Sequence, residues 1–317
     1  MGVFAIFNYQ FGKIVNESKE GHLFSNEEET QRINEAFENR QEIFDDIIDR
    51  DFLKEDIIHF CNKYSGDKEY IHRYVVPPTD NISVMRLANK RSTTIVNEQL
   101  KERQEDDYPN CLVIIDNRKG IQRILIEQKK TAFQSPKQVA QILEFTFNRI
   151  LRFYHLQIEL MHLQDPASFW QCVKDRKSYP DGFYKVTFHL PHLNLERLRK
   201  IFDKVLVISR EVFDSDLEWS YKAQEGGELA IDENNPYQKE LIEWMMSEVG
   251  SENIRLFSNA QKRKAIVVGK DSFLAVGISD TTIRRLAEDA MNGDLFGSGA
   301  LDEIKTKTKT GIDMQTN

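Results

Sequence analysis

Glu127 and Lys129 are the residues whose types and spacing most readily suggest chemistry in this chain. They stand at the end of an apolar run, residues 121 to 128, that has the β-branched content of a strand. Because alternate side chains of a strand lie on the same face, the carboxylate and the ammonium group are expected side by side. There the carboxylate could hold Mg²⁺, and the ammonium group could steady an attacking water or the developing charge on a phosphoryl group.

This Glu-x-Lys spacing resembles half of the PD-(D/E)xK nuclease pattern, which needs a second acid beside the first. A hairpin that turns at Arg118-Lys119 would place Asp116 about 20 Å along the strand from Glu127, too far to share an ion. Asp107 is then the acid that remains, and Gln141 on the following helix matches a glutamine that many such nucleases place there. This hypothesis makes Asp107, Glu127 and Lys129 catalytic, with Asp107 and Glu127 as Mg²⁺ ligands. Without that activity no cofactor is expected.

Positive charge gathers around the same hairpin and the helix that follows it. From Arg118 to Arg152, eight Lys/Arg stand against two acids, a net charge of +6 in a chain of net charge −8. Such segregation favours an anionic partner, because basic side chains bind the phosphate backbone of nucleic acids without reading the bases. The leading hypothesis is therefore a non-catalytic protein that binds DNA or RNA. The expected contact residues are Arg123, Lys129, Lys130, Gln141, Arg149 and Arg152.

An acidic segment near the amino terminus supports a third hypothesis. Residues 27 to 56 carry twelve Asp/Glu against four Lys/Arg. Asn26 and Glu29 form a capping box, which predicts a helix that exposes its acids and buries its apolar residues. The residues expected to be buried are Ile33, Phe37, Phe44 and Ile47/Ile48. The exposed acids are an ordinary solvated face, a surface that repels nucleic acid, or an acidic patch that docks a basic protein partner.

Helix and strand signals alternate along the chain and predict an α/β or α+β fold with a mixed sheet. Its centre is a β-hairpin, residues 111 to 115 and 121 to 128, followed by a long helix that begins at Ser135-Pro136. The polar run from Glu98 to Asp107 is predicted to be a linker, or a short helix that closes the first half of the chain. The expected parts are a smaller N-terminal α+β domain with the acidic helix (1–105), an α/β domain with the basic hairpin–helix unit (106–300) and a polar tail (301–317).

Elements are also expected on either side of this unit. The predicted strands are residues 3–11, 70–76, 82–88, 93–96, 157–163, 184–189, 217–221 and 265–268. The predicted helices are residues 166–175, 195–207, 237–248 and 281–291.

Composition narrows the class of protein. At 317 residues and 40% hydrophobic content the chain can bury a substantial core, whereas no apolar run approaches the roughly 20 residues of a membrane span. The start lacks the features of a signal peptide. Three widely separated cysteines (Cys61, Cys111 and Cys172) form no disulfide framework or zinc motif, so a cytoplasmic protein is expected. The general character is that of a prokaryotic accessory protein, such as an antiviral-defence or mobile-element component, and its oligomeric state stays open.

Overall fold

A computed structural model describes residues 1–14, 27–51, 57–62, 66–96, 98–190, 217–250, 253–258, 264–268, 273–294 and 298–309. Within these ranges seven α-helices and fourteen strands form an α+β fold, which confirms the fold class predicted from the sequence. The chain divides into two compact units: Met1–Leu160 with Ala275–Asn317 (unit 1), and Met161–Leu274 (unit 2). The boundary predicted near residue 105 falls inside a strand of unit 1, because the hairpin–helix unit and the amino-terminal strands share one sheet.

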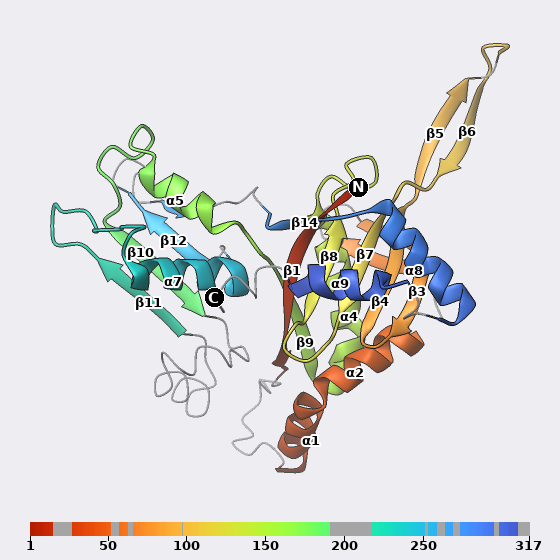
Figure 1. Cartoon of the computed structure of the whole chain (residues 1–317), viewed down its shortest axis with the longest axis horizontal. Helices are drawn as coiled ribbons and strands as arrows, with labels where there is room; N and C mark the ends of the chain where they lie inside the picture. Colours follow the sequence, from red (N-terminus) through yellow and green to blue (C-terminus); the bar gives the residue numbers. More distant parts are fainter. Residues whose placement is uncertain are drawn as a thin grey trace. The chain divides into compact units, whose positions relative to one another are not determined.

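Unit 1 is built on an eight-stranded sheet in the order β14-β1-β8-β7-β4-β3-β2, and β9 also pairs with β1 (Figure 1). The six neighbouring pairs along this order are antiparallel. The strands are β1 (Gly2–Lys13), β2 (Ile57–Asn62), β3 (Gly66–Thr79), β4 (Ile82–Asn89), β7 (Asn110–Asp116), β8 (Arg123–Glu127), β9 (Leu156–His162) and β14 (Ala275–Ile278).

One face of this sheet packs on helices α2 (Arg40–Asp46) and α4 (Pro136–Leu151). Tyr9 and Phe11 of β1 both lie against Phe44 of α2, with ring centroids 5.3 and 5.5 Å apart. Phe44 packs on Phe147 of α4 at 4.9 Å. All four rings are buried. Since burying one such side chain contributes about 1.5–3 kcal/mol, this aromatic cluster fixes α4 on the sheet.

The acidic helix expected near the amino terminus is present as α1 (Glu27–Glu38), followed by α2 and a π-helical turn (Ile47–Asp51). The predicted burial is wrong for Phe37, which is only partly buried, and is confirmed for the other apolar residues, Ile33, Phe44, Ile47 and Ile48. Asn26, the expected capping residue, lies outside the described residues.

The opposite face of the sheet packs on helices α8 (Asp280–Asn292) and α9 (Ala300–Lys309), drawn in blue in Figure 1. Asn8 of β1 and Arg123 of β8 are paired in register and point to this face, where Arg123 reaches the Thr308 carbonyl oxygen. The polar tail predicted from residue 301 is wrong for α9, because Leu301 and Ile304 recur at helical spacing and are buried. Residues 310–317 lie outside the described residues.

Strands β4 and β7 continue beyond the sheet as a two-stranded ribbon of β5 (Arg91–Val96) and β6 (Glu102–Asp107), which projects from unit 1 in Figure 1. The amide of Asn89 donates to the Pro109 carbonyl, so the ladder of β4 and β7 runs directly into that of β5 and β6. The linker or short helix predicted over residues 98–107 is therefore wrong, because most of this run is β6.

Unit 2 contains a four-stranded antiparallel sheet in the order β11-β10-β12-β13. Its elements are α5 (Pro166–Lys174), β10 (Lys185–Leu190), β11 (Leu217–Lys222), α7 (Pro236–Trp244) with a π-helical turn (Met245–Val249), β12 (Ile254–Phe257) and β13 (Ala265–Val267). Both helices begin at a capping side chain, Asp165 and Asn235, followed by proline. These elements confirm the predicted strands and helices of this region, while the helix predicted over 195–207 lies outside the described residues.

Candidate nucleic-acid interface

Helix α4 begins where the sequence predicts and presents one polar face. The Ser135 hydroxyl accepts a hydrogen bond from the Gln138 amide, and Pro136 stands in the first turn. The buried side is apolar apart from Thr146. On the exposed side, every fourth residue forms one stripe about 18 Å long at 1.5 Å per residue. These exposed residues are Lys137, Gln141, Phe145 and Arg149.

The stripe continues into the short 3-10 helix Arg152–Tyr154 that follows α4. Arg152 is exposed, and Phe153 is 83% exposed. An exposed aromatic ring beside two arginines is a suitable surface for nucleic acid, because bases stack on rings while guanidinium groups bind phosphate.

Lys129 and Lys130 lie at the other end of the stripe, in the loop between β8 and α4, and both are exposed. The Lys129 carbonyl accepts hydrogen bonds from the amides of Ala132 and Phe133, which folds the loop into a tight turn. The Ala132 carbonyl accepts from Asn89 and Arg91 at the base of the ribbon. The loop is therefore held against the junction of β4 and β5.

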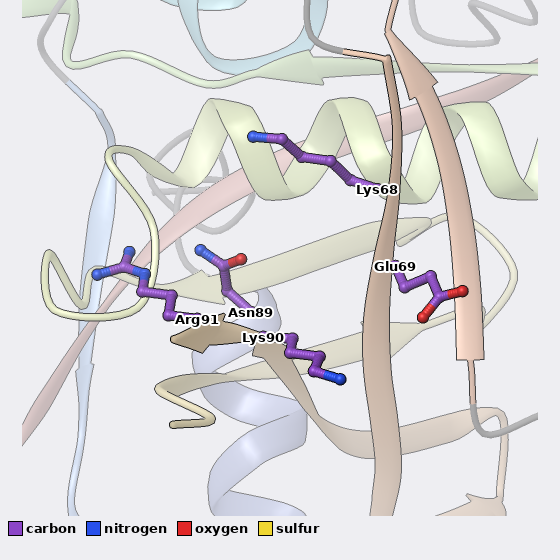
Figure 2. A pocket seen from close by; sticks show the side chains of 5 residues that line it. All are labelled: Lys68, Glu69, Asn89, Lys90 and Arg91. Carbon is purple, nitrogen blue, oxygen red and sulfur yellow. The ribbon is translucent and has the colours of Figure 1, made fainter. Parts of the chain in front are cut away.

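A hollow of about 530 Å³ lies at this junction, lined by Lys68, Glu69, Asn89, Lys90 and Arg91 (Figure 2). Lys68 and Glu69 extend to opposite sides of β3 in Figure 2, as neighbours on a strand must. Lys90 pairs with Asp106 at 3.3 Å, and the hydrogen bond that its ammonium group donates to Asp106 raises the pKa of Lys90. Sequence reasoning missed Lys68, since a single lysine in a polar strand carries no distinguishing signal.

The two acids inside the basic segment are occupied by main-chain amides. Glu127 accepts a hydrogen bond from the Leu112 amide at 2.9 Å, and Glu144 accepts one from Leu160 at 2.9 Å. Burial raises the pKa of Glu144. Within the part of the chain that the structure describes, no ion pair engages the cations of the interface. These cations are Lys129, Lys130, Lys137, Arg149 and Arg152.

The prediction that Arg123 contacts nucleic acid is wrong. Arg123 is 0% exposed, and it lies on the face of the sheet opposite α4, where it binds Asn8 and Thr308. Arg118 is likewise engaged, because it forms an ion pair with the buried carboxylate of Asp116 at 2.6 Å. The +6 charge counted along the sequence therefore overstates the charge that the surface presents.

The side chain of Asn148, on α4, is likewise not available to a ligand, because it is hydrogen-bonded to main-chain groups. Its amide nitrogen donates to the Ile158 carbonyl, and its oxygen accepts from the Ile158 amide. Together with Glu144 it satisfies main-chain groups of β9, so this part of the helix serves the fold.

The predicted nuclease residues lie on separate elements. A turn at Arg118-Lys119 would pair Asp116 with Ile121. In the structure Asp116 pairs with Arg123 instead, so the hairpin register is shifted by two residues from the predicted one. Asp107 ends β6 opposite Arg91, in a different sheet from Glu127. Five residues of chain, which span at most about 16 Å when extended, separate it from Leu112, the residue whose amide Glu127 binds. The two expected Mg²⁺ ligands therefore stand on different strands of different sheets.

The remaining partners of the nuclease hypothesis are also apart. By strand alternation Glu127 points to the face of Arg123, whereas Gln141 is exposed on α4 across the sheet. Lys129 stands beyond the end of β8, in the loop. Among the residues that the structure describes, no group of three His, Cys, Asp or Glu side chains is placed to hold a metal ion.

The cysteines are free, as their spacing predicts. Cys111 is buried in β7, and burial raises its pKa to about 12, which keeps the thiol protonated and unreactive. In the described ranges no helix combines the length and apolar character that crossing a membrane requires.

Comparison with known proteins adds no family to this picture. The chain matches no protein-family model, and no curated protein is significantly similar to it.

Proposed function

We propose that the protein binds nucleic acid through the interface formed by the loop after β8, the exposed stripe of α4 and the 3-10 helix. The observation that carries this proposal is the set of five exposed cations on one continuous stretch, with the acids among them bound to main-chain amides instead. Such cations contact phosphate oxygens and release condensed counterions. Gln141 adds a hydrogen-bonding group in the middle of the stripe.

The exposed ring of Phe153 favours a single strand as the ligand. A ring stacks on an unpaired base whatever its sequence, at about 1–3 kcal/mol per base, but it meets no free base face in a duplex. The ring of Phe145, which is 38% exposed, stands in the middle of the same stripe. Its centroid lies 5.3 Å from the ring centroid of Phe60. Binding is therefore expected to depend strongly on salt and weakly on base sequence.

Fluorescence anisotropy with a labelled single-stranded oligonucleotide tests the proposal. The variant Arg149→Ala with Arg152→Ala is expected to weaken binding by about tenfold or more, and to lower the slope of log affinity against log salt by about 1.4 if each arginine contacts one phosphate. The matched control is Arg284→Ala with Arg285→Ala, which removes the same charge from exposed positions on α8.

Two outcomes would remove the proposal: no binding by the natural chain at low salt, or equal weakening in the test and control variants. The second outcome would mean that net charge alone governs binding. Preference for a duplex over a single strand would agree with phosphate contacts by the cations but would exclude the stacking role of Phe153.

We also propose a cytoplasmic location, supported by the free thiol of the exposed Cys61, which a reducing compartment preserves. Cell fractionation tests this part separately.

A further inference from the structure

The ribbon of β5 and β6 forms a sheet of its own, so each strand leaves one edge without a partner among the described strands. The two edges differ in chemistry. After Arg91, strand β5 reads Ser-Thr-Thr-Ile-Val and carries no charge, whereas β6 carries four acids and one arginine in six residues. All six side chains of β5 are exposed.

Natural sheets protect exposed edges with charges, prolines or bulges, because an open row of amides and carbonyls is a template for another strand. The acids protect β6 in this way. Strand β5 has none of these devices between Ser92 and Val96, and its register against β6 runs without a shift. Four of its residues are β-branched, which suits them to pairing in a sheet.

We propose that β5 pairs with β5 of a second copy of this chain, so that two ribbons form one four-stranded antiparallel sheet about a two-fold axis. A strand that pairs with its own twin must be self-complementary, and the uncharged residues 92–96 of β5 meet their twins without charge repulsion. The acidic β6 strands then form the outer edges, where like charges oppose the addition of a third copy. The difference in charge between β5 and β6 therefore explains both why two copies pair and why a third copy does not add to the sheet.

In an antiparallel pair the tip of each ribbon lies beside the base of the other. The tip carries acids (Glu98 and Glu102) and bases (Lys101 and Arg103) in equal number, so net charge does not oppose this contact. The tip exposes apolar side chains whose burial against the second copy is favourable. These are Ile95 (46% exposed), Val96 (53%) and Leu100 (84%).

Stability gives a further reason for pairing. A two-stranded ribbon alone in water is marginally stable, and three or more strands are needed for independent stability. The dimer would supply the missing strands to a ribbon that otherwise projects into solvent.

Sedimentation velocity of the full chain over a wide range of concentrations tests the inference, which does not depend on the proposed function. The natural chain is expected to sediment as a dimer that dissociates on dilution. Thr94 and Gln104 are exposed cross-strand partners, one on each edge. Thr94→Lys is therefore expected to lose the dimer, whereas Gln104→Lys, with the same added charge on the same face of the ribbon, should keep it.

A chain that stays monomeric at every concentration would overturn the inference, as would two variants that behave alike. Hydrogen exchange of the natural chain guards against a variant that folds poorly. Amides of β5 should exchange more slowly at concentrations where the dimer forms, and unchanged exchange there would also contradict the pairing.

Discussion

Arg123 and Thr308 are joined by a hydrogen bond of 2.7 Å from the guanidinium Nη1 to the main-chain oxygen, although 185 residues separate them in sequence. The Nε of the same arginine donates to Asn8 Oδ1 at 3.0 Å. A fully buried cation thus ties β8 to β1 and to the last turn of α9, where the helix dipole favours positive charge.

Replacing this arginine should damage stability, not ligand binding. Arg123→Met leaves the oxygens of Asn8 and Thr308 without their donor, so we expect a loss of about 2–4 kcal/mol in the free energy of unfolding. Urea unfolding followed by circular dichroism measures it. Arg149→Met is the matched exposed variant, with a loss near zero in stability and weaker oligonucleotide binding. An unstable Arg149→Met or a stable Arg123→Met would contradict the assignment of the two arginines.

The Thr308 hydroxyl provides an independent test of the α9 contact. It donates to the Asp116 carboxylate at 2.6 Å, and that carboxylate is fully buried. Thr308→Val keeps the shape of the side chain but removes the donor, so unfolding should become easier by about 1–3 kcal/mol. Thr306→Val changes an exposed residue on the same helix and should have little effect. Equal effects would show that the buried bond contributes nothing specific.

The stability of unit 1 should vary with pH through Glu144. Burial raises the pKa of this carboxyl above its ordinary value of 4.5, so the folded state holds the proton more tightly than the unfolded state. Stability contributed by Glu144 is therefore lost as pH rises through the window between those two pKa values. Glu144→Gln lacks this titration and can still accept from the Leu160 amide.

The melting temperature of Glu144→Gln minus that of the natural chain should be larger at neutral pH than below the ordinary glutamate pKa. Thermal unfolding at the two pH values measures the difference, and Glu288→Gln, at an exposed position of α8, is the control. A constant difference across pH would argue against a buried, titrating Glu144.

The cysteines should differ in reactivity. Iodoacetamide attacks the thiolate, and Cys61 is exposed whereas Cys111 is buried with a pKa of about 12. Under native conditions at mildly alkaline pH, mass spectrometry should find Cys61 alkylated and Cys111 unmodified until the protein is unfolded. Early modification of Cys111 would mean that β7 opens readily.

The nuclease alternative is tested at Glu127. Because this carboxylate binds the Leu112 amide, Glu127→Gln should keep the fold and bind the oligonucleotide at least as tightly as the natural chain. Incubation of both proteins with Mg²⁺ and a labelled substrate completes the test. Cleavage by the natural chain that disappears in the folded variant would establish the nuclease and displace the binding-only function.

Local signals predicted the elements well where the deciding contacts are also local. Ser135 and Pro136 mark the start of α4 because the cap is made within four residues. The hairpin was recognised, but its register was wrong by two, because residues 117–122 form a longer connection with positive φ at Gly120 and Gln122. Gly120 indicates a turn in the sequence, but it does not show that Gln122 also adopts a positive φ.

The candidate site was harder to predict, because burial depends on distant partners. Arg123 opens an apolar strand and looks like a surface cation until Asn8 and Thr308 are placed around it. Arg149 and Arg152 were predicted to be exposed and are, since the apolar spacing of α4 itself defines its buried side. The hollow at the ribbon base joins β3, β4 and β5, and nothing in the local pattern of those strands predicts it.

Unit 1 is assembled from two stretches of chain, and the whole of unit 2 is translated between them. On the ribosome, residues 1–160 emerge well before α9 exists, so the acceptor that Arg123 requires is not yet made. Unit 2, continuous from Met161 to Leu274, can fold before the second stretch of unit 1 has been synthesised. A nonsense codon late in the reading frame would therefore harm the amino-terminal sheet, far from where synthesis stopped.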